Sequence, residues 1–126
     1  MPSGPETEIR APRRVLVAED DFLVAMDLED LLSSEGWCVV GPVATVKAAL
    51  DSIEKAPPDA AVLDVDLAGE RAAPIAAALK ALGVPFALVS GYTEAQLTEA
   101  EFAGAARVGK PCSAAELVSV IRRMLP

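Results

Sequence analysis

The sequence predicts an α/β fold in which a doubly wound, five-stranded parallel sheet is covered by five helices. Short, continuously apolar runs alternate with longer amphipathic segments along most of the 126 residues. Such apolar runs are typical of strands buried on both faces of a parallel sheet, and the longer segments are typical of the helices that join them. A chain of this length has room for one core, so we expect a single domain over residues 13–126. Residues 1–12 hold three prolines and mixed charges and are expected to form a disordered tail.

The first predicted strand covers residues 15–18, a continuously apolar run that is followed by acidic residues. The first helix covers residues 21–35, where apolar residues recur at helical spacing, and Gly36 stands where a helix-ending glycine belongs. The second strand covers residues 37–40. We expect the turn formers Gly41-Pro42 to end it.

Thr45 is placed to cap the second helix, which is expected to run to about residue 55 and to end before two prolines. The third strand covers residues 60–63 and, like the first, is followed by an acidic residue. The third helix, over residues 72–82, is rich in alanine and is followed by Gly83, which suits a helix end.

The fourth strand covers residues 86–89 and follows a proline. We expect the fourth helix over residues 93–102, where Thr93 and Gln96 have the spacing of a capping box but apolar residues are few. The fifth strand covers residues 105–108 and has the weakest strand pattern of the five.

The fifth helix begins at a second capping box, formed by Ser113 and Glu116, and carries apolar residues on one face up to residue 124. Val118 and Leu125 lie beside that face, either as an exposed apolar ridge for a partner or as part of a broad core contact. Five strand–helix units in succession favour a flavodoxin-like sheet with the strand order 2-1-3-4-5 and right-handed connections.

The composition excludes several kinds of activity. The chain has 19 acidic and 11 basic side chains and a net charge of −8, so direct binding to nucleic acid is not expected. It has no histidine, which excludes a Ser-His-Asp triad, a Cys-His dyad and a histidine-ligated zinc site within this chain. It has no apolar run of the ~20 residues that a membrane span needs and no signal-peptide pattern, so we expect a cytoplasmic location without membrane contact.

Polar residues follow four of the predicted strands, and in a parallel sheet these strand ends share one edge. Glu19-Asp20-Asp21 follow the first strand and Asp64-Val65-Asp66 follow the third. Ser90-Gly91-Tyr92 follow the fourth strand and Gly109-Lys110-Pro111 follow the fifth. Asp21 is best explained as the cap of the first helix. The other side chains should bring carboxylates, a hydroxyl and an ammonium group together.

Carboxylates placed this close repel one another, at a cost of about 4 kcal/mol for a pair at ~4 Å in a medium with an effective dielectric constant of ~20. A divalent ion such as Mg²⁺ offsets that repulsion and takes carboxylate, water and phosphate oxygens as ligands. Ser90 and Lys110 supply the donors that a phosphoryl group needs. One carboxylate can accept that group, because aspartyl phosphates are known covalent intermediates.

These motifs resemble the receiver domain of the response regulators of two-component systems. The resemblance covers residues 13–125 and rests on four segments in order: Val15-Leu16-Val17-Ala18-Glu19-Asp20-Asp21, Pro58-Asp59 leading into Val62-Leu63-Asp64-Val65, Leu88-Val89-Ser90-Gly91 and Lys110-Pro111. It implies that Asp64 accepts a phosphoryl group from a sensor histidine kinase or a histidine phosphotransfer protein and that this switches a protein–protein interaction surface. It also implies no enzymatic activity beyond self-phosphoryl transfer and autodephosphorylation.

By the same resemblance, Mg²⁺ is held by Asp20 and Asp64, by Glu19 acting through water, and by the backbone carbonyl of Asp66. The side chain of Asp66 stands where receivers tune their own dephosphorylation, and Tyr92 occupies a second such position. We expect the Asp66 carboxylate to favour Mg²⁺ binding or the Tyr92 ring to shield the acyl phosphate from water.

The resemblance further implies that Ser90 senses the phosphoryl oxygens and that Lys110 pairs with them. Residues 86–92 are partly similar to the Phe-Ala-Thr-Gly-Tyr receivers, a subgroup with many stand-alone regulators of alphaproteobacteria. Many receivers carry an aromatic ring three residues before the lysine, where this chain has Arg107. We therefore expect the conformational change in the loop of Tyr92 or in the fourth helix.

Two other functions are left open. Asp64-Val65-Asp66-Leu67 resembles the nucleophile motif of haloacid-dehalogenase-like phosphatases, although that family places its nucleophile strand first, and here Glu19-Asp20 precede it. The second alternative is a receiver-like adaptor that acts by contact without phosphorylation. The short chain favours a stand-alone regulator, although a receiver excised from a larger protein would look the same. Beyond the kinase we expect a downstream protein target, and a monomer or a weak homodimer through the face from the fourth to the fifth helix.

Overall fold

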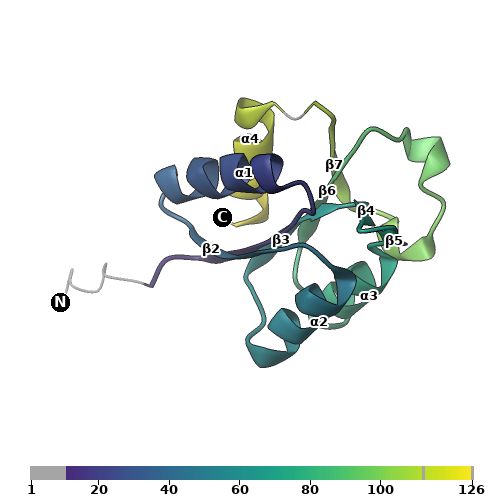
Figure 1. Ribbon diagram of the computed structural model, residues 1–126, viewed down its shortest axis with the longest axis horizontal. Coiled ribbons are helices and arrows are strands. Elements are labelled where there is room, and N and C mark those ends of the chain that lie inside the picture. Colours follow the sequence, from purple (N-terminus) through teal and green to yellow (C-terminus); the bar gives the residue numbers. More distant parts are fainter. Residues whose placement is uncertain (1–10, 112, 126) are drawn as a thin grey trace.

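The computed structural model describes residues 11–111 and 113–125. Its central sheet has five parallel strands in the order β2-β1-β3-β6-β7 (Figure 1). The strands are β1 (Arg14–Ala18), β2 (Cys38–Val43), β3 (Ala60–Asp64), β6 (Phe86–Ser90) and β7 (Ala106–Gly109). Numbered among themselves, they have the order 2-1-3-4-5, so the predicted fold class and strand order are confirmed.

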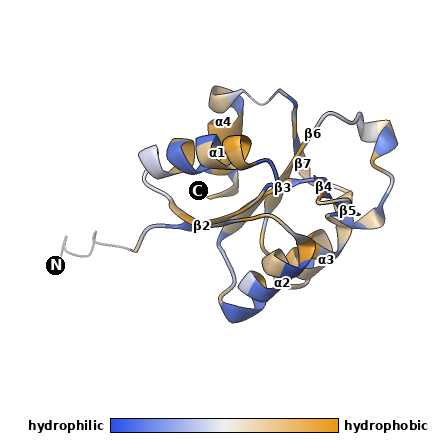
Figure 2. Ribbon diagram, in the orientation of Figure 1, coloured by the Kyte–Doolittle hydropathy of each residue, from blue (hydrophilic) through white to orange (hydrophobic). Residues whose placement is uncertain are grey.

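Helices cover both faces of this sheet. They are α1 (Phe22–Ser34), α2 (Val46–Lys55), α3 (Ala73–Ala81) and α4 (Ala114–Met124). In Figure 1, α1 and α4 lie on one side of the sheet and α2 and α3 lie on the other. Because side chains alternate along a strand, Leu16 joins the core under α2 and α3, whereas Val15 and Val17 join the core under α1 and α4. The strands and the helix faces turned toward them are accordingly hydrophobic (Figure 2).

Three helices begin at the caps that the sequence predicts. The Asp21 side chain accepts hydrogen bonds of 3.0 and 3.2 Å from the backbone N–H groups of Leu23 and Val24 at the start of α1. Thr45 caps α2 and Ser113 caps α4 in the same way. Each cap satisfies backbone donors that the first turn of a helix leaves without a partner.

The second strand is longer than predicted. The sequence predicts that Gly41-Pro42 ends it, but β2 continues through both residues to Val43. A proline is tolerated here because β2 lies at the edge of the sheet, where one side of the strand needs no backbone donors. The extension allows the Val43 carbonyl to accept a hydrogen bond of 2.9 Å from the backbone N–H of Glu19.

The prediction of a fourth helix over residues 93–102 is wrong. This segment forms two short 3₁₀ turns, η1 (Glu94–Gln96) and η2 (Ala100–Phe102), so the described residues contain four α-helices rather than five. Half of the capping box is present, since the Gln96 side-chain oxygen accepts a hydrogen bond of 2.7 Å from the backbone N–H of Thr93. The segment has little apolar surface to bury against the sheet, and a short helix without such packing is not stable.

A small antiparallel hairpin follows β3, in the stretch between the third predicted strand and the third predicted helix. Its strands are β4 (Asp66–Leu67) and β5 (Glu70–Arg71), and the first residue of β4 lies opposite the last residue of β5. The two residues between them, Ala68 and Gly69, have positive φ values of 51° and 86°. Two such residues in succession form the tight turn that matches the twist of a hairpin.

The remaining expectations concern the two ends of the domain. Val118 is buried, and Leu125 is half-buried and packs against the core under α1 and α4, so the pair does not form an exposed apolar ridge. Residues 1–10 of the predicted tail lie outside the described residues, and residues 11–13 belong to no helix or strand. Among the described residues, no helix has the length and apolarity that crossing a membrane requires.

Candidate functional site

Three carboxylates meet at the carboxyl edge of the sheet. Glu19 and Asp20 follow β1, and Asp64 is the last residue of the neighbouring strand β3. One side-chain oxygen from each of the three residues lies within 4.8 Å of the other two. Glu19 and Asp64 are 3% and 8% exposed, whereas Asp20 is exposed. The predicted acidic cluster is therefore present and is partly shielded from water.

Glu19 lies deepest in this cluster. Its Oε2 accepts a hydrogen bond of 3.0 Å from the backbone N–H of Asp21. Burial, which disfavours the charged form, raises the pKa of Glu19 to about 7 with the help of the neighbouring Asp64 carboxylate. The Asp21 hydrogen bond and the Lys110 ammonium act in the opposite direction without cancelling the rise. The protein's own groups thus leave part of the negative charge in the cluster uncompensated.

Asp64 is held from two sides. Its Oδ1 accepts a hydrogen bond of 3.3 Å from the backbone N–H of Asp66, and its Oδ2 accepts one of 3.0 Å from Nζ of Lys110. The same ammonium group lies 3.9 Å from Oε1 of Glu19. Partial burial acts to lower the pKa of Lys110, but the Asp64 hydrogen bond and the surrounding carboxylates raise it overall. Lys110 therefore contributes one firm positive charge to the cluster.

Asp20 connects the end of β1 to the turn of the hairpin. Its Oδ2 accepts a hydrogen bond of 2.9 Å from the backbone N–H of Ala68. Ala68 has a positive φ of 51°, an uncommon conformation for a residue with a side chain. The hairpin turn thereby orients the most exposed of the three carboxylates.

Ser90 ends β6, the strand next to β3, and is 2% exposed. Its Oγ accepts a hydrogen bond of 2.8 Å from the backbone N–H of Tyr92, which leaves its own hydrogen for donation to another group. Its backbone carbonyl accepts a hydrogen bond of 3.0 Å from the N–H of Lys110. The predicted hydroxyl and ammonium groups therefore lie at the same sheet edge as the carboxylates.

The side chain of Asp66 has its partners outside the three-carboxylate cluster. Its Oδ2 accepts a hydrogen bond of 2.8 Å from the Tyr92 hydroxyl, and its Oδ1 accepts one of 3.4 Å from the Arg71 guanidinium. The hydrogen bond to Asp66 raises the pKa of the Tyr92 hydroxyl above its ordinary value. The two residues that the resemblance links to dephosphorylation are thus in contact with each other.

Sequence reasoning missed Arg71, which contacts both of these residues and also Glu99. The one available signal is the pair of opposite charges at Asp66 and Arg71 on either side of a glycine-containing turn, which is the spacing of a cross-strand pair. Arg107, which stands where many receivers have an aromatic ring, donates a hydrogen bond of 2.9 Å to the backbone carbonyl of Tyr92.

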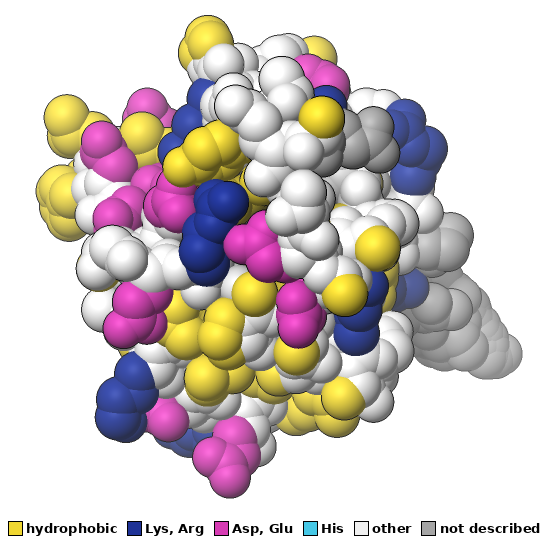
Figure 3. Space-filling model, turned by 90° about the vertical axis from the view of Figure 1, so that its right-hand side faces the viewer, with side chains coloured by type: hydrophobic (Ala, Val, Ile, Leu, Met, Phe, Trp, Pro, Cys, Tyr) yellow, Lys and Arg dark blue, Asp and Glu magenta, His cyan; other side chains and the backbone are white. Residues whose placement is uncertain are grey.

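The donor set of the acidic cluster fits Mg²⁺. Glu19, Asp20 and Asp64 offer hard carboxylate oxygens that are close enough to share one ion, and Mg²⁺ is bound in proteins through such oxygens. Figure 3 shows acidic and basic side chains next to one another on the face that includes this sheet edge. The three carboxylates would hold the ion, which would neutralise charge on any group transferred to this edge.

A doubly wound sheet with acids and a lysine gathered at its carboxyl edge defines a class of signalling domains. The family model described as the response regulator receiver domain matches residues 15–122. The chain therefore belongs to the response regulator receiver domain family. Receiver domains bind Mg²⁺ at an acidic pocket and are generally not enzymes.

The chain is similar in sequence or structure to several bacterial proteins. The chain is 33% identical, over 94% of its length, to the transcriptional regulatory protein PdtaR of Mycobacterium tuberculosis, and it spans 60% of the length of that protein. It is 34% identical to SdrG of Sphingomonas melonis Fr1, with a TM-score of 0.77 and coverage of 94% of this chain and 100% of that one. The REC domain of the response regulator PhyR from Erythrobacter litoralis has 29% identity, a TM-score of 0.81 and coverage of 91% of each chain.

Proposed function

We propose that this receiver domain is the phosphoacceptor in a His-Asp phosphorelay and that Asp64 carries the phosphoryl group. One observation supports this more than any other. Oδ2 of Asp64 lies 3.0 Å from the Lys110 ammonium, at an edge where oxygens of Glu19 and Asp20 lie within 4.8 Å. A nucleophilic carboxylate, a cation for the incoming charge and a candidate metal site are thus side by side.

In the proposed reaction, a carboxylate oxygen of Asp64 attacks the phosphorus of a phosphohistidine on a partner protein. A P–O bond forms, the P–N bond breaks, and its electron pair stays on the imidazole nitrogen of the partner. These 126 residues contain no histidine, so the donor histidine lies outside them, and we propose that it belongs to a sensor histidine kinase or a histidine phosphotransfer protein.

Two side chains bind the transferred group. The Lys110 ammonium, which now donates to Asp64, would donate to a phosphoryl oxygen and so follow the negative charge. The Ser90 hydroxyl would donate its free hydrogen to a second phosphoryl oxygen while still accepting from the Tyr92 N–H. Glu19, Asp20, Asp64 and the backbone carbonyl of Asp66 would hold Mg²⁺, whose charge offsets that of the phosphoryl oxygens.

Phosphorylation would then change the surface formed by residues 91–105, β7 and α4. Ser90 directly precedes residue 91 and Lys110 directly follows β7, so new bonds to a phosphoryl group pull on both ends of the stretch 91–109, which leads into α4. Arg107 connects β7 to the Tyr92 carbonyl within it. A downstream protein, or a second copy of this chain, would bind one state of this surface more tightly than the other.

The intact mass of the protein after incubation with acetyl phosphate and Mg²⁺ tests this function. We expect wild type to gain one phosphate, Asp64→Ala to gain none, and Asp51→Ala to behave as wild type, because Asp51 is exposed on α2 and pairs only with Lys47 among the described residues. A chelator added before acetyl phosphate should prevent the gain. An adduct that forms equally on Asp64→Ala contradicts the assignment.

The same samples separate the two alternatives. A haloacid-dehalogenase-like phosphatase would release phosphate from a small phosphomonoester over many turnovers, and we expect no such release. An adaptor that acts without phosphorylation would show no adduct on wild type with either acetyl phosphate or a phosphorylated donor protein.

A further inference from the structure

A second group of contacting side chains, here called the rim group, consists of Asp66, Arg71, Tyr92 and Glu99. The Tyr92 hydroxyl donates a hydrogen bond of 2.8 Å to Asp66, and the Arg71 guanidinium lies 4.7 Å from the centre of the Tyr92 ring. Arg71 also donates to Asp66 at 3.4 Å and forms an ion pair of 3.0 Å with Glu99. Arg71 is therefore the member that contacts all three others.

The position of Arg71 in the chain explains this central role. It is the last residue of β5 and lies directly opposite Asp66 in the antiparallel pair, where opposite charges attract across the two strands. Its guanidinium is planar, so it can donate to carboxylates at its edge while its face stacks on an aromatic ring. A lysine has a single rotatable ammonium group and cannot do both in one fixed geometry.

Two hydrogen bonds join the rim group to Asp64, which is proposed to carry the phosphoryl group, and to Ser90, which is proposed to bind it. The backbone N–H of Asp66 donates to Oδ1 of Asp64, and the backbone N–H of Tyr92 donates to Oγ of Ser90. The Tyr92–Asp66 hydrogen bond closes this chain of contacts between β3 and β6. Asp66 and Tyr92, whose side chains both contact Arg71, are thus connected to Asp64 and Ser90 through their own backbone N–H groups.

We propose that Arg71 is a positioning residue that keeps Tyr92 and Asp66 beside the aspartyl phosphate and so limits the access of water to it. The role rests on the proposed phosphorylation of Asp64. In the hydrolysis that it slows, a water oxygen attacks phosphorus, the bond between phosphorus and the Asp64 oxygen breaks, and the products are the Asp64 carboxylate and inorganic phosphate. The proton of the water goes to the phosphate or to solvent.

Glu99 is a second acidic partner of Arg71, in addition to Asp66. Its Oε2 forms the ion pair with Arg71, while its Oε1 is buried and has no hydrogen-bond partner among the described residues. Arg71 therefore balances the charge of a carboxylate that is partly withdrawn from water. Glu99 precedes η2, so the same contact joins Arg71 to the segment 91–105, in which no α-helix forms.

The decay of the phosphate adduct after removal of acetyl phosphate tests this role. We expect Arg71→Ala to form the adduct at the wild-type rate and to lose it about fivefold faster, since losing interactions worth one ordinary hydrogen bond changes a rate by about that factor. Glu99→Gln should accelerate the loss to a smaller extent. Lys47→Ala removes an exposed ion pair on α2 and should decay as wild type does.

A second comparison separates positioning from general stability. If Arg71 acts through Tyr92, Arg71→Ala should accelerate decay less in a Tyr92→Ala background than in wild type. Equal decay of wild type and Arg71→Ala, or an undiminished effect in the Tyr92→Ala background, would overturn the role of Arg71 and leave the phosphoacceptor function intact. Absence of any adduct on wild type would overturn the phosphoacceptor function and this role with it.

Discussion

The connections that contain an α-helix and the connection between β6 and β7, residues 91–105, are stabilised in different ways. Helix α1 buries Ala25, Leu28 and Leu32 against the sheet, and α2, α3 and α4 bury similar sets. In the segment from 91 to 105, Phe102 is buried and Leu97 is only half-buried. Good helix formers and a possible cap are present in both regions, so an apolar face decides whether a helix forms.

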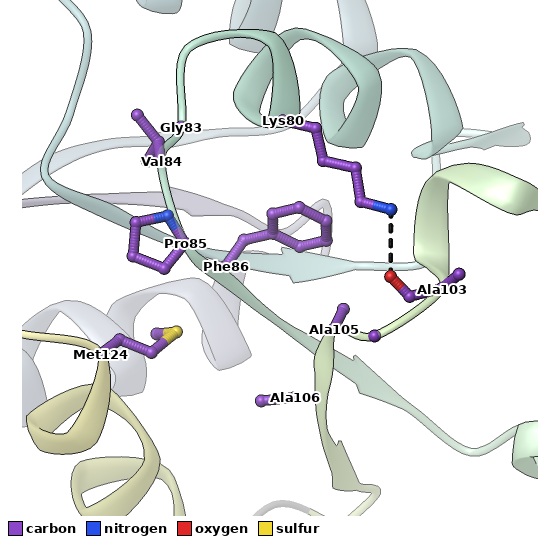
Figure 4. A pocket seen from close by; sticks show the side chains of 10 residues that line it. Lys80, Gly83, Val84, Pro85, Phe86, Ala103, Ala105, Ala106 and Met124 are labelled. Carbon is purple, nitrogen blue, oxygen red and sulfur yellow. Dashed lines mark hydrogen bonds between the residues drawn. The ribbon is translucent and has the colours of Figure 1, made fainter.

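Polar contacts take the place of this packing in the segment 91–105. Nζ of Lys80, on α3, donates a hydrogen bond of 3.0 Å to the backbone carbonyl of Ala103 (Figure 4). It donates a second hydrogen bond, of 3.3 Å, to the backbone carbonyl of Ala100. Arg107 holds the other end of the segment at the Tyr92 carbonyl, and Arg71 holds its middle at Glu99. Three cationic side chains from the surrounding elements thus order a stretch that its own sequence does not order.

Shortening one apolar side chain in each region should give the largest difference between them. Leu32 is fully buried under α1, so we expect Leu32→Ala to lower the free energy of unfolding by about 3 kcal/mol. Leu97→Ala removes a half-buried side chain and should cost about 1 kcal/mol or less. Chemical denaturation at constant pH measures both. Equal losses would show that the segment 91–105 is packed as tightly as the helices are.

Removing a cation that holds the segment should give an intermediate effect. Lys80→Ala is expected to lower the free energy of unfolding by about 0.5–1 kcal/mol, the net value of an ordinary hydrogen bond, and to speed amide exchange within residues 91–105. The control is Lys55→Ala, which also removes a lysine from the last turn of a helix. Faster exchange in Lys55→Ala to the same extent would mean that the contact of Lys80 with the carbonyls is irrelevant.

The sequence was sufficient to predict features that depend on local pattern. Strand order, three helix caps, and the meeting of Glu19, Asp20 and Asp64 at one edge all follow from short apolar runs and from the residues that end them. The absent fourth helix depends on how much apolar surface the finished sheet offers, which no local pattern states. The contacts of Arg71 depend on a two-residue hairpin, whose strands are too short to leave a periodic signal.

Substitution of the helix cap Thr45 and of its counterpart Thr93 should give a difference of similar size between the two regions. The Thr45 hydroxyl accepts a hydrogen bond of 3.1 Å from the backbone N–H of Ala48, so Thr45→Ala should cost about 1 kcal/mol of unfolding free energy. Thr93 begins no α-helix, and its contact with Gln96 uses backbone atoms of Thr93, so Thr93→Ala should change stability by no more than about 0.3 kcal/mol. Thermal unfolding of the two variants measures the difference. A cost for Thr93→Ala as large as that for Thr45→Ala would indicate that residues 93–102 spend much of their time as a helix in solution.

The smallest expected effect lies in the hairpin turn, a helix-free stretch that is ordered by its own backbone rather than by cations from elsewhere. Ala68 has a φ of 51°, a conformation that costs an alanine about 1 kcal/mol and a glycine almost nothing. Glycine also gains freedom in the unfolded chain, worth about 0.4–1 kcal/mol, so the two effects of Ala68→Gly nearly cancel and the net change should stay within about 0.5 kcal/mol.

Gly69 has a φ of 86° and no atom within 4 Å of an added Cβ, so Gly69→Ala should be destabilising through backbone strain alone. A clear stabilisation by Gly69→Ala would contradict the turn geometry, because it would require a backbone conformation that alanine adopts readily.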